Sequence, residues 1–128
     1  FAAEGGPIRL PEFRFANFLD TTHNKGCVHA YYKFYAYVRP QNLAPDWSRD
    51  RIVDEIVTRG VPCFQGSCSE VYLEKAFDNT SFRPEERLPH AKLLGETSLM
   101  FLCHPSLTKD EIQKTCEVMT SVITDYFG

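Results

Sequence analysis

The sequence predicts an α+β domain, an open-faced sandwich in which helices cover one face of a small, mainly antiparallel three-stranded sheet. Three features support this fold: one long segment of alternating apolar residues, two short apolar segments of strand length, and helical segments around them. The chain has 128 residues, and 43% of them are hydrophobic and 24% charged, which are ordinary values for one globular domain. We expect one sheet face to stay uncovered within this chain.

Residues 1–27 contain Gly, Pro, Asn and Thr with little periodicity, and they are expected to form an irregular lead-in. The domain itself is expected to span residues 28–128. The first residue is Phe1 rather than Met, so the natural start is expected upstream, in a larger domain that precedes this one.

Residues 28–39 alternate between apolar and polar-tipped side chains and are rich in aromatic residues, which is typical of a long half-buried strand. Pro40 ends the strand because it has no N–H to donate. The apolar set, expected under the helices, is Val28, Ala30, Tyr32, Phe34, Ala36 and Val38. The opposite set, expected on the less covered face, includes Tyr31, Lys33, Tyr35 and Tyr37.

A helix is expected to follow, capped by Ser48 or Asp46 and ending near residue 59, where Gly60 suits a C-terminus. Residues 61–64 form the second predicted strand. The small-residue turn at 65–69 leads into a short helix over about 70–77.

Another short helix is predicted over residues 88–95, and the continuous apolar segment 98–103 has the length of a strand. Thr108 and Glu111 form a capping box, in which each side chain accepts from the other residue's backbone N–H. Apolar residues then recur at helical spacing, so a final helix is expected up to the C-terminal residues.

The sequence contains none of the usual signatures of catalysis. There is no HExxH spacing, no Gly-rich phosphate loop and no paired carboxylates, and the five cysteines form no CxxC pair. A metal site is therefore not expected, and the thiols indicate a reduced, cytoplasmic protein. A net charge of −3 argues against nucleic acid as a partner, and no apolar segment approaches the ~20 residues of a membrane span.

Five segments carry a resemblance to a known family. They are residues 29–34 (HAYYKF), 58–62 (TRGVP), 72–77 (YLEKAF), 88–94 (LPHAKLL) and 102–108 (LCHPSLT), the last followed by Glu111. In order and spacing they resemble the C-terminal domain of the pyridoxal-phosphate-dependent nucleotide-sugar aminotransferases, the DegT/DnrJ/EryC1/StrS family. The resemblance covers about residues 28–127.

This resemblance implies a fold-type-I aminotransferase, usually a homodimer, whose large N-terminal domain holds pyridoxal phosphate on a lysine. The enzyme would pass an amino group from a glutamate-type donor to the cofactor and then to a keto-sugar nucleotide. No lysine of this chain matches the cofactor motif, so no residue here is expected to be catalytic. The chain alone is expected to be inactive and to hold no cofactor.

Many family members carry a His-Tyr pair, which touches the sugar, shortly after the Gly-Ile that corresponds to Gly60 and Val61. Here residues 64–70 read FQGSCSE, which leaves the sugar substrate open. The residues expected to bind substrate are Gln65, Ser67, Ser69 and Tyr72. Their hydroxyl and amide groups suit a nucleotide-sugar, and the N–H groups of a helix starting near residue 70 would suit its phosphates. Alternatively, Ser69 only caps that helix.

The uncovered face would be the seat of the missing large domain, through Tyr31, Lys33, Tyr35 and Tyr37. Two other classes of function remain open. One is a stand-alone regulatory or structural α+β domain. The other is an open-faced sheet on which Tyr31, Tyr35 and Tyr37 stack single-stranded RNA, although the strand lacks the glycine of RNA-recognition strands and the pI is acidic, near 5.8.

Overall fold

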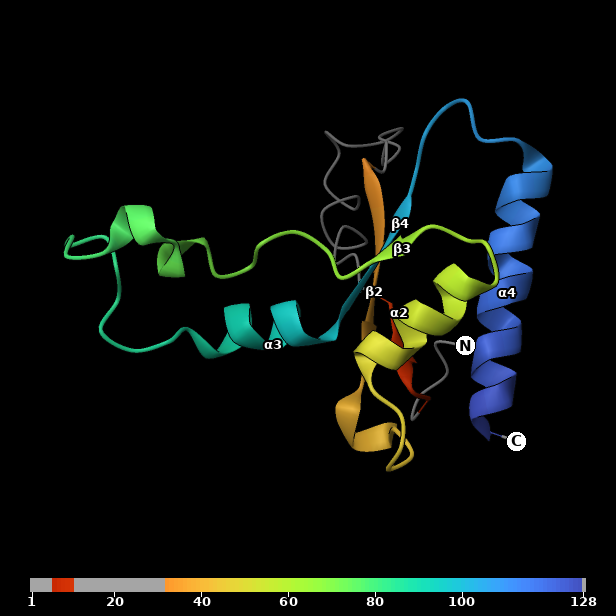
Figure 1. The fold of residues 1–128 in the computed structure, drawn as a ribbon, viewed down its shortest axis with the longest axis horizontal. Coiled ribbons are helices and arrows are strands. Elements are labelled where there is room, and N and C mark those ends of the chain that lie inside the picture. The colour runs from red at the N-terminus through yellow and green to blue at the C-terminus, as the bar shows by residue number, and fades with distance from the viewer. Residues whose placement is uncertain (1–5, 11–31, 128) are drawn as a thin grey trace, which may run out of the picture.

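The computed structural model describes residues 6–10 and 32–127. It confirms the predicted α+β fold (Figure 1). The strands are β1 (Ile8–Arg9), β2 (Lys33–Val38), β3 (Cys63–Phe64) and β4 (Ser98–Leu102). The helices are α2 (Arg49–Thr58), α3 (Pro89–Thr97) and α4 (Lys109–Phe127), with 3-10 turns η1 (Pro40–Asn42), η2 (Val71–Leu73) and η3 (Lys75–Phe77).

The sheet has the order β1-β2-β4-β3, and every neighbouring pair is antiparallel. Within the described residues the sheet therefore has four strands instead of the three predicted, because Ile8 and Arg9 of the expected lead-in pair with the end of β2. Arg39 holds this edge in place: its backbone N donates to the Pro7 carbonyl at 2.7 Å, and its guanidinium donates to the Gly6 carbonyl at 2.6 Å. A strand of two residues is too short to produce a recognisable period.

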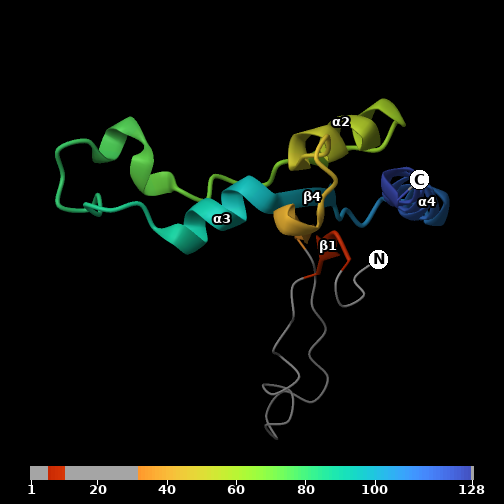
Figure 2. The same ribbon diagram turned by 90° about the horizontal axis from the view of Figure 1, so that it is seen from below.

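The helices α2 and α4 pack on one face of the sheet (Figure 2). Their buried side chains meet the apolar residues of β2 and β4. This core consists of Ile8, Ala36, Val38, Ile52, Ile56, Val61, Cys63, Leu99, Phe101, Val122 and Ile123, all at most 6% exposed. Burial raises the pKa of the Cys63 thiol to about 11, which keeps it protonated at neutral pH.

The helices α2 and α4 begin at the capping residues that the sequence predicted. The hydroxyl of Ser48 accepts from the backbone N of Arg51 at 3.1 Å, so Ser48 caps α2. At α4, the N of Thr108 donates to Glu111 Oε2 at 2.8 Å, and the N of Glu111 donates to Thr108 Oγ1 at 3.2 Å. The predicted capping box is therefore confirmed. The hydrogen bond from the Thr108 backbone N–H, followed by the one from the Thr108 hydroxyl, lowers the pKa of the Glu111 carboxyl.

Two expectations need correction. Tyr32 does not lie under the helices: it precedes β2 and is 85% exposed, because β4 ends opposite Lys33 and leaves Tyr32 without a strand neighbour. The expected helix after residue 70 is a pair of 3-10 turns separated by an extended Glu74. Such short turns lack a helix dipole of useful size, so the argument for a phosphate site at a helix start is lost. Val28, Ala30 and Tyr31 lie outside the described residues.

Residues 65–97 leave the sheet after β3 and return to it at β4, and we call them the arm. Figures 1 and 2 show the arm, including α3, extending away from the sheet and from α2 and α4. Within the described ranges, no helix is both long and apolar enough to cross a membrane.

Candidate functional site

The sheet face opposite α2 and α4 carries an ordered set of aromatic side chains. Tyr35 pairs across the sheet with Met100, and Tyr37 lies between Arg9 and Ser98. The Tyr35 and Tyr37 rings stack with centroids 6.5 Å apart, and the Arg9 guanidinium lies 4.6 Å from the Tyr37 ring centroid. Both tyrosines are partly exposed, as the alternation predicted, and the face offers flat apolar surface beside a positive charge.

The turn at residues 65–69 lies against this same face. The Tyr35 hydroxyl is 3.0 Å from the Ser67 hydroxyl, and the Ser98 hydroxyl donates to the Gln65 carbonyl. Two sets of predicted site residues, Gln65 and Ser67 on the turn and Tyr35 on the strand, are thus parts of one surface. The turn also covers part of the face on which RNA bases would have to stack.

Arg49 fixes this turn, although no sequence pattern pointed to it. Its side chain is 14% exposed, and Nη1 donates to the carbonyls of Gly95 at 2.9 Å and Ser98 at 3.2 Å, with the Gln65 carbonyl at 3.5 Å. Asp50 completes the cluster, since its Oδ1 accepts from Arg49 Nε at 2.6 Å and from the Gln65 amide at 3.2 Å. In the sequence, Arg49 stands out only as a cation in the first turn of a helix, where it opposes the helix dipole; this does not indicate which groups it binds.

Gly66 is the residue that lets the turn approach the sheet. Its φ is +95°, and an added Cβ would lie 2.7 Å from the Ser98 hydroxyl and 3.2 Å from Tyr35 Cε1. We expect Gly66→Ala to lower the free energy of unfolding by more than ~1 kcal/mol, from the left-handed backbone and the crowding together.

Urea denaturation of the variant measures this loss. Gly95→Ala is not a suitable control, because Ser69 packs against Gly95. Glu86→Ala, at an exposed position of the arm outside its helix and turns, is the better reference and should change the unfolding midpoint little. A Gly66→Ala protein as stable as the wild type would show that the turn does not rest on the sheet.

Tyr72 and Ser69 lie away from the tyrosine face, the sheet face that carries Tyr35 and Tyr37. Ser69 packs beside Gly95 of α3 and does not cap a helix, because the residue before η2 is Glu70, which makes no side-chain cap bond.

Tyr72 is 9% exposed, and its hydroxyl donates to Glu70 Oε1 at 2.7 Å and accepts from the Leu88 N at 2.9 Å. Burial is the first cause of the raised pKa of Tyr72, whereas the Arg87 guanidinium lowers the pKa of Glu70. The Tyr72 hydroxyl therefore has its hydrogen-bond partners inside the arm. Substitution of Tyr72 would disturb the structure of the arm, so an effect on substrate binding could not be assigned to Tyr72 itself.

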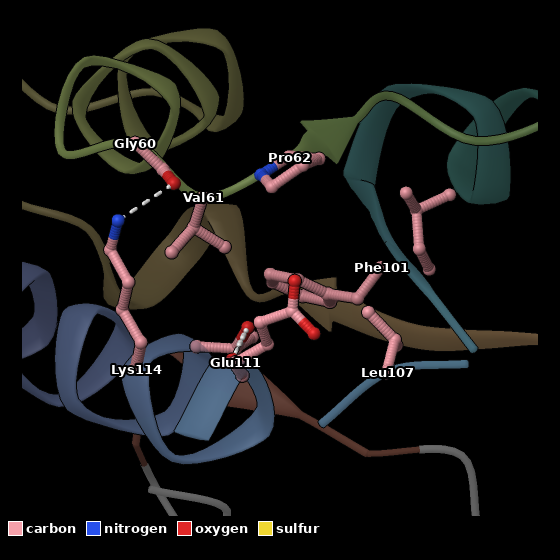
Figure 3. A pocket seen from close by; sticks show the side chains of 9 residues that line it. Gly60, Val61, Pro62, Phe101, Leu107, Glu111 and Lys114 are labelled. Atoms are coloured by element: carbon pink, nitrogen blue, oxygen red, sulfur yellow. Dashed lines mark hydrogen bonds between the residues drawn. The ribbon is translucent and has the colours of Figure 1, made fainter. Parts of the chain in front are cut away.

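An open cavity lies elsewhere, between the end of α2, the end of β4 and the start of α4 (Figure 3). It measures about 330 Å³ and is lined by Gly60, Val61, Pro62, Phe101, Leu102, Leu107, Glu111, Lys114 and Thr115. Its two charged groups are already engaged, Lys114 Nζ with the Gly60 carbonyl at 3.2 Å and Glu111 in the capping box. None of the predicted site residues lines it.

The described residues do not fit a cofactor or metal site. No group of three or more His, Cys, Asp or Glu side chains among them could hold a metal ion. Pyridoxal phosphate needs a lysine for its Schiff base and an Asp or Arg at its ring nitrogen. Lys33 is half-buried with its Nζ 5.2 Å from the Tyr32 ring centroid, and the other lysines of the described part of the chain are exposed.

Neither a protein-family model nor a curated protein matches this sequence. Among solved structures, the chain is similar to an aminotransferase from Psychrobacter cryohalolentis, with 52% sequence identity and a TM-score of 0.83. The match covers 98% of this chain and 30% of that chain, so this chain spans less than a third of that protein's length. In sequence and in fold, this chain is similar over nearly all its length to one part of an aminotransferase.

Proposed function

We propose that this chain is the C-terminal small domain of a longer, pyridoxal-phosphate-dependent aminotransferase that transfers an amino group to a keto-sugar nucleotide. The observation that carries the proposal is the 52% identity to an aminotransferase over 98% of the chain. The order of the resembling segments, from residue 29 to Glu111, supports the narrower assignment to nucleotide-sugars.

In this proposal the tyrosine face of the sheet and the turn at residues 65–69 have different roles. The large N-terminal domain holds the cofactor, which supplies the electron sink for amino transfer, and the parent is a homodimer. The face with Tyr31, Lys33, Tyr35 and Tyr37 meets that domain. The turn that carries Gln65, Ser67 and Ser69 reaches the sugar nucleotide, and Arg49 keeps it in position against the sheet.

The direct test is the activity of the longer enzyme. Incubation with glutamate and a keto-sugar nucleotide should give an amino sugar nucleotide, detected by mass spectrometry. An enzyme that aminates amino-acid-derived keto acids but no sugar nucleotide would contradict the substrate assignment.

The chain alone is expected to bind no pyridoxal phosphate and to transfer no amino group, because its described lysines are not built into a cofactor site. Adding the cofactor and recording the visible spectrum before and after dialysis measures this. A stoichiometric absorbance band that survives dialysis would contradict the assignment of the cofactor to another domain.

Ser67→Ala in the longer enzyme is expected to raise KM for the sugar nucleotide about two- to tenfold, the worth of one hydrogen bond. The half-reaction with the amino donor should stay nearly unchanged. Ser106→Ala is the control, an exposed serine that bonds His104 at the other end of β4. Equal kinetics in both variants would show that the turn is only scaffold.

A further inference from the structure

The arm exposes most of its large apolar side chains. These are Val71, Leu73, Phe82, Leu88, Leu93 and Leu94, with exposures from 38% for Leu73 to 78% for Phe82. The helix α3 buries only Thr97, whereas α2, of similar length, buries Ile52 and Ile56. Exposed apolar side chains gathered on one segment mark a surface that meets another macromolecule.

The arm is held in shape by its own contacts. Arg87 binds the Glu70 carboxylate through Nε at 2.7 Å and Nη2 at 2.5 Å, and Arg83 pairs with Asp78. The Tyr72 hydroxyl accepts a hydrogen bond from the backbone N of Leu88 at 2.9 Å, which connects the start of α3 to η2. A segment fixed in this way presents its surface without a large loss of entropy on binding.

The comparison with the solved aminotransferase indicates what covers the arm. Since the match covers 98% of this chain at a TM-score of 0.83, it includes nearly the whole arm, in a polypeptide most of which lies outside the match. The arm thus has a counterpart in a longer aminotransferase polypeptide, in which further chain is present to cover it.

We propose that the exposed apolar side chains of the arm dock on the part of the aminotransferase polypeptide outside this chain. The arm would then be a second contact between the domains, separate from the tyrosine face of the sheet. The identity of the docking partner, the rest of the aminotransferase polypeptide, depends on the proposed function. The exposure of the apolar side chains of the arm does not.

Hydroxyl-radical footprinting with mass spectrometry tests this on the wild-type sequence, in the 128-residue chain and in the longer enzyme. Phe82, Leu93 and Leu94 should be oxidised readily in the chain alone and at the rate of buried side chains in the longer enzyme. Ile112 on α4, which is 51% exposed against 49% for Leu93, is the internal reference and should react alike in both. Equal oxidation of the arm in both proteins would overturn the proposal.

A second measurement uses the double variant Leu93→Gln, Leu94→Gln, with Ile112→Gln as its matched control. The double variant should leave the thermal midpoint of the chain alone unchanged and lower that of the longer enzyme by about 2–4 °C for each leucine. The control should change neither. If the double variant left the thermal midpoint unchanged in both proteins, this would contradict docking.

The remaining outcomes separate this inference from the proposed function. Protection of the arm in the chain alone, lost on dilution, would mean that a second copy covers it, and the proposal would fail. An arm that is protected in a longer enzyme without amino-transfer activity would support docking and contradict the proposed function.

Discussion

Replacing Ile56 by alanine is expected to lower the free energy of unfolding of the chain by about 2–5 kcal/mol. Ile56 lies on the sheet-facing side of α2 and is 0% exposed, so its loss leaves a cavity between the helix and the sheet. A domain of this size has a total stability of only about 5–15 kcal/mol, so the loss is a large part of it. Urea denaturation followed by the circular dichroism of the helices gives the value.

The next residue provides the control. Val57 is 49% exposed on the same helix, so Val57→Ala removes little buried surface and places a better helix former in α2. We expect a change within about 0.5 kcal/mol. Equal losses in the two variants would show that α2 is not packed on the sheet through Ile56.

Arg49→Met is expected to lower the free energy of unfolding by about 2–3 kcal/mol, because hydrogen bonds from a charged donor are lost and two backbone carbonyls keep no such partner. These are the carbonyls of Gly95 and Ser98, and the Gln65 carbonyl loses its weaker contact as well. Urea denaturation measures the loss. The amide of Gly66 should exchange faster with solvent in the variant, since the turn loses its anchor.

Arg51→Met is the matched control two residues along α2. Arg51 is 42% exposed, pairs with Asp46 at 2.8 Å and lies over the Trp47 ring, so its loss should cost no more than about 1 kcal/mol. If Arg49→Met leaves both the stability and the exchange of the Gly66 amide unchanged, then Arg49 does not position the turn. If the turn loosens and sugar-nucleotide kinetics in the longer enzyme stay the same, the turn does not bind substrate.

The sequence by itself determined the elements whose signals are local. The alternation of Phe34, Ala36 and Val38 assigned the core face of β2, since side chains of a strand point alternately to its two faces. Ser48 and the pair Thr108 and Glu111 were recognisable because a capping residue bonds backbone groups three positions away.

The turn at residues 65–69 was also predictable from its small residues, and the structure brings Ser67 to Tyr35 and the Gln65 carbonyl to Ser98. That Gln65 and Ser67 bind substrate stays a prediction. The position of Tyr72 inside the arm was not predictable, because its partner amide belongs to Leu88, sixteen residues along the chain.

Only the tertiary structure decided the features that depend on distant neighbours. β1 exists because Ile8 meets Val38 across the sheet, and Tyr32 is exposed because β4 ends one residue too early to pair with it. Arg49 gained its role from carbonyls 16, 46 and 49 residues along the chain, which no local pattern encodes. The sequence predicted the helix α3, but helical spacing alone cannot tell whether the surface that its leucines meet belongs to this chain.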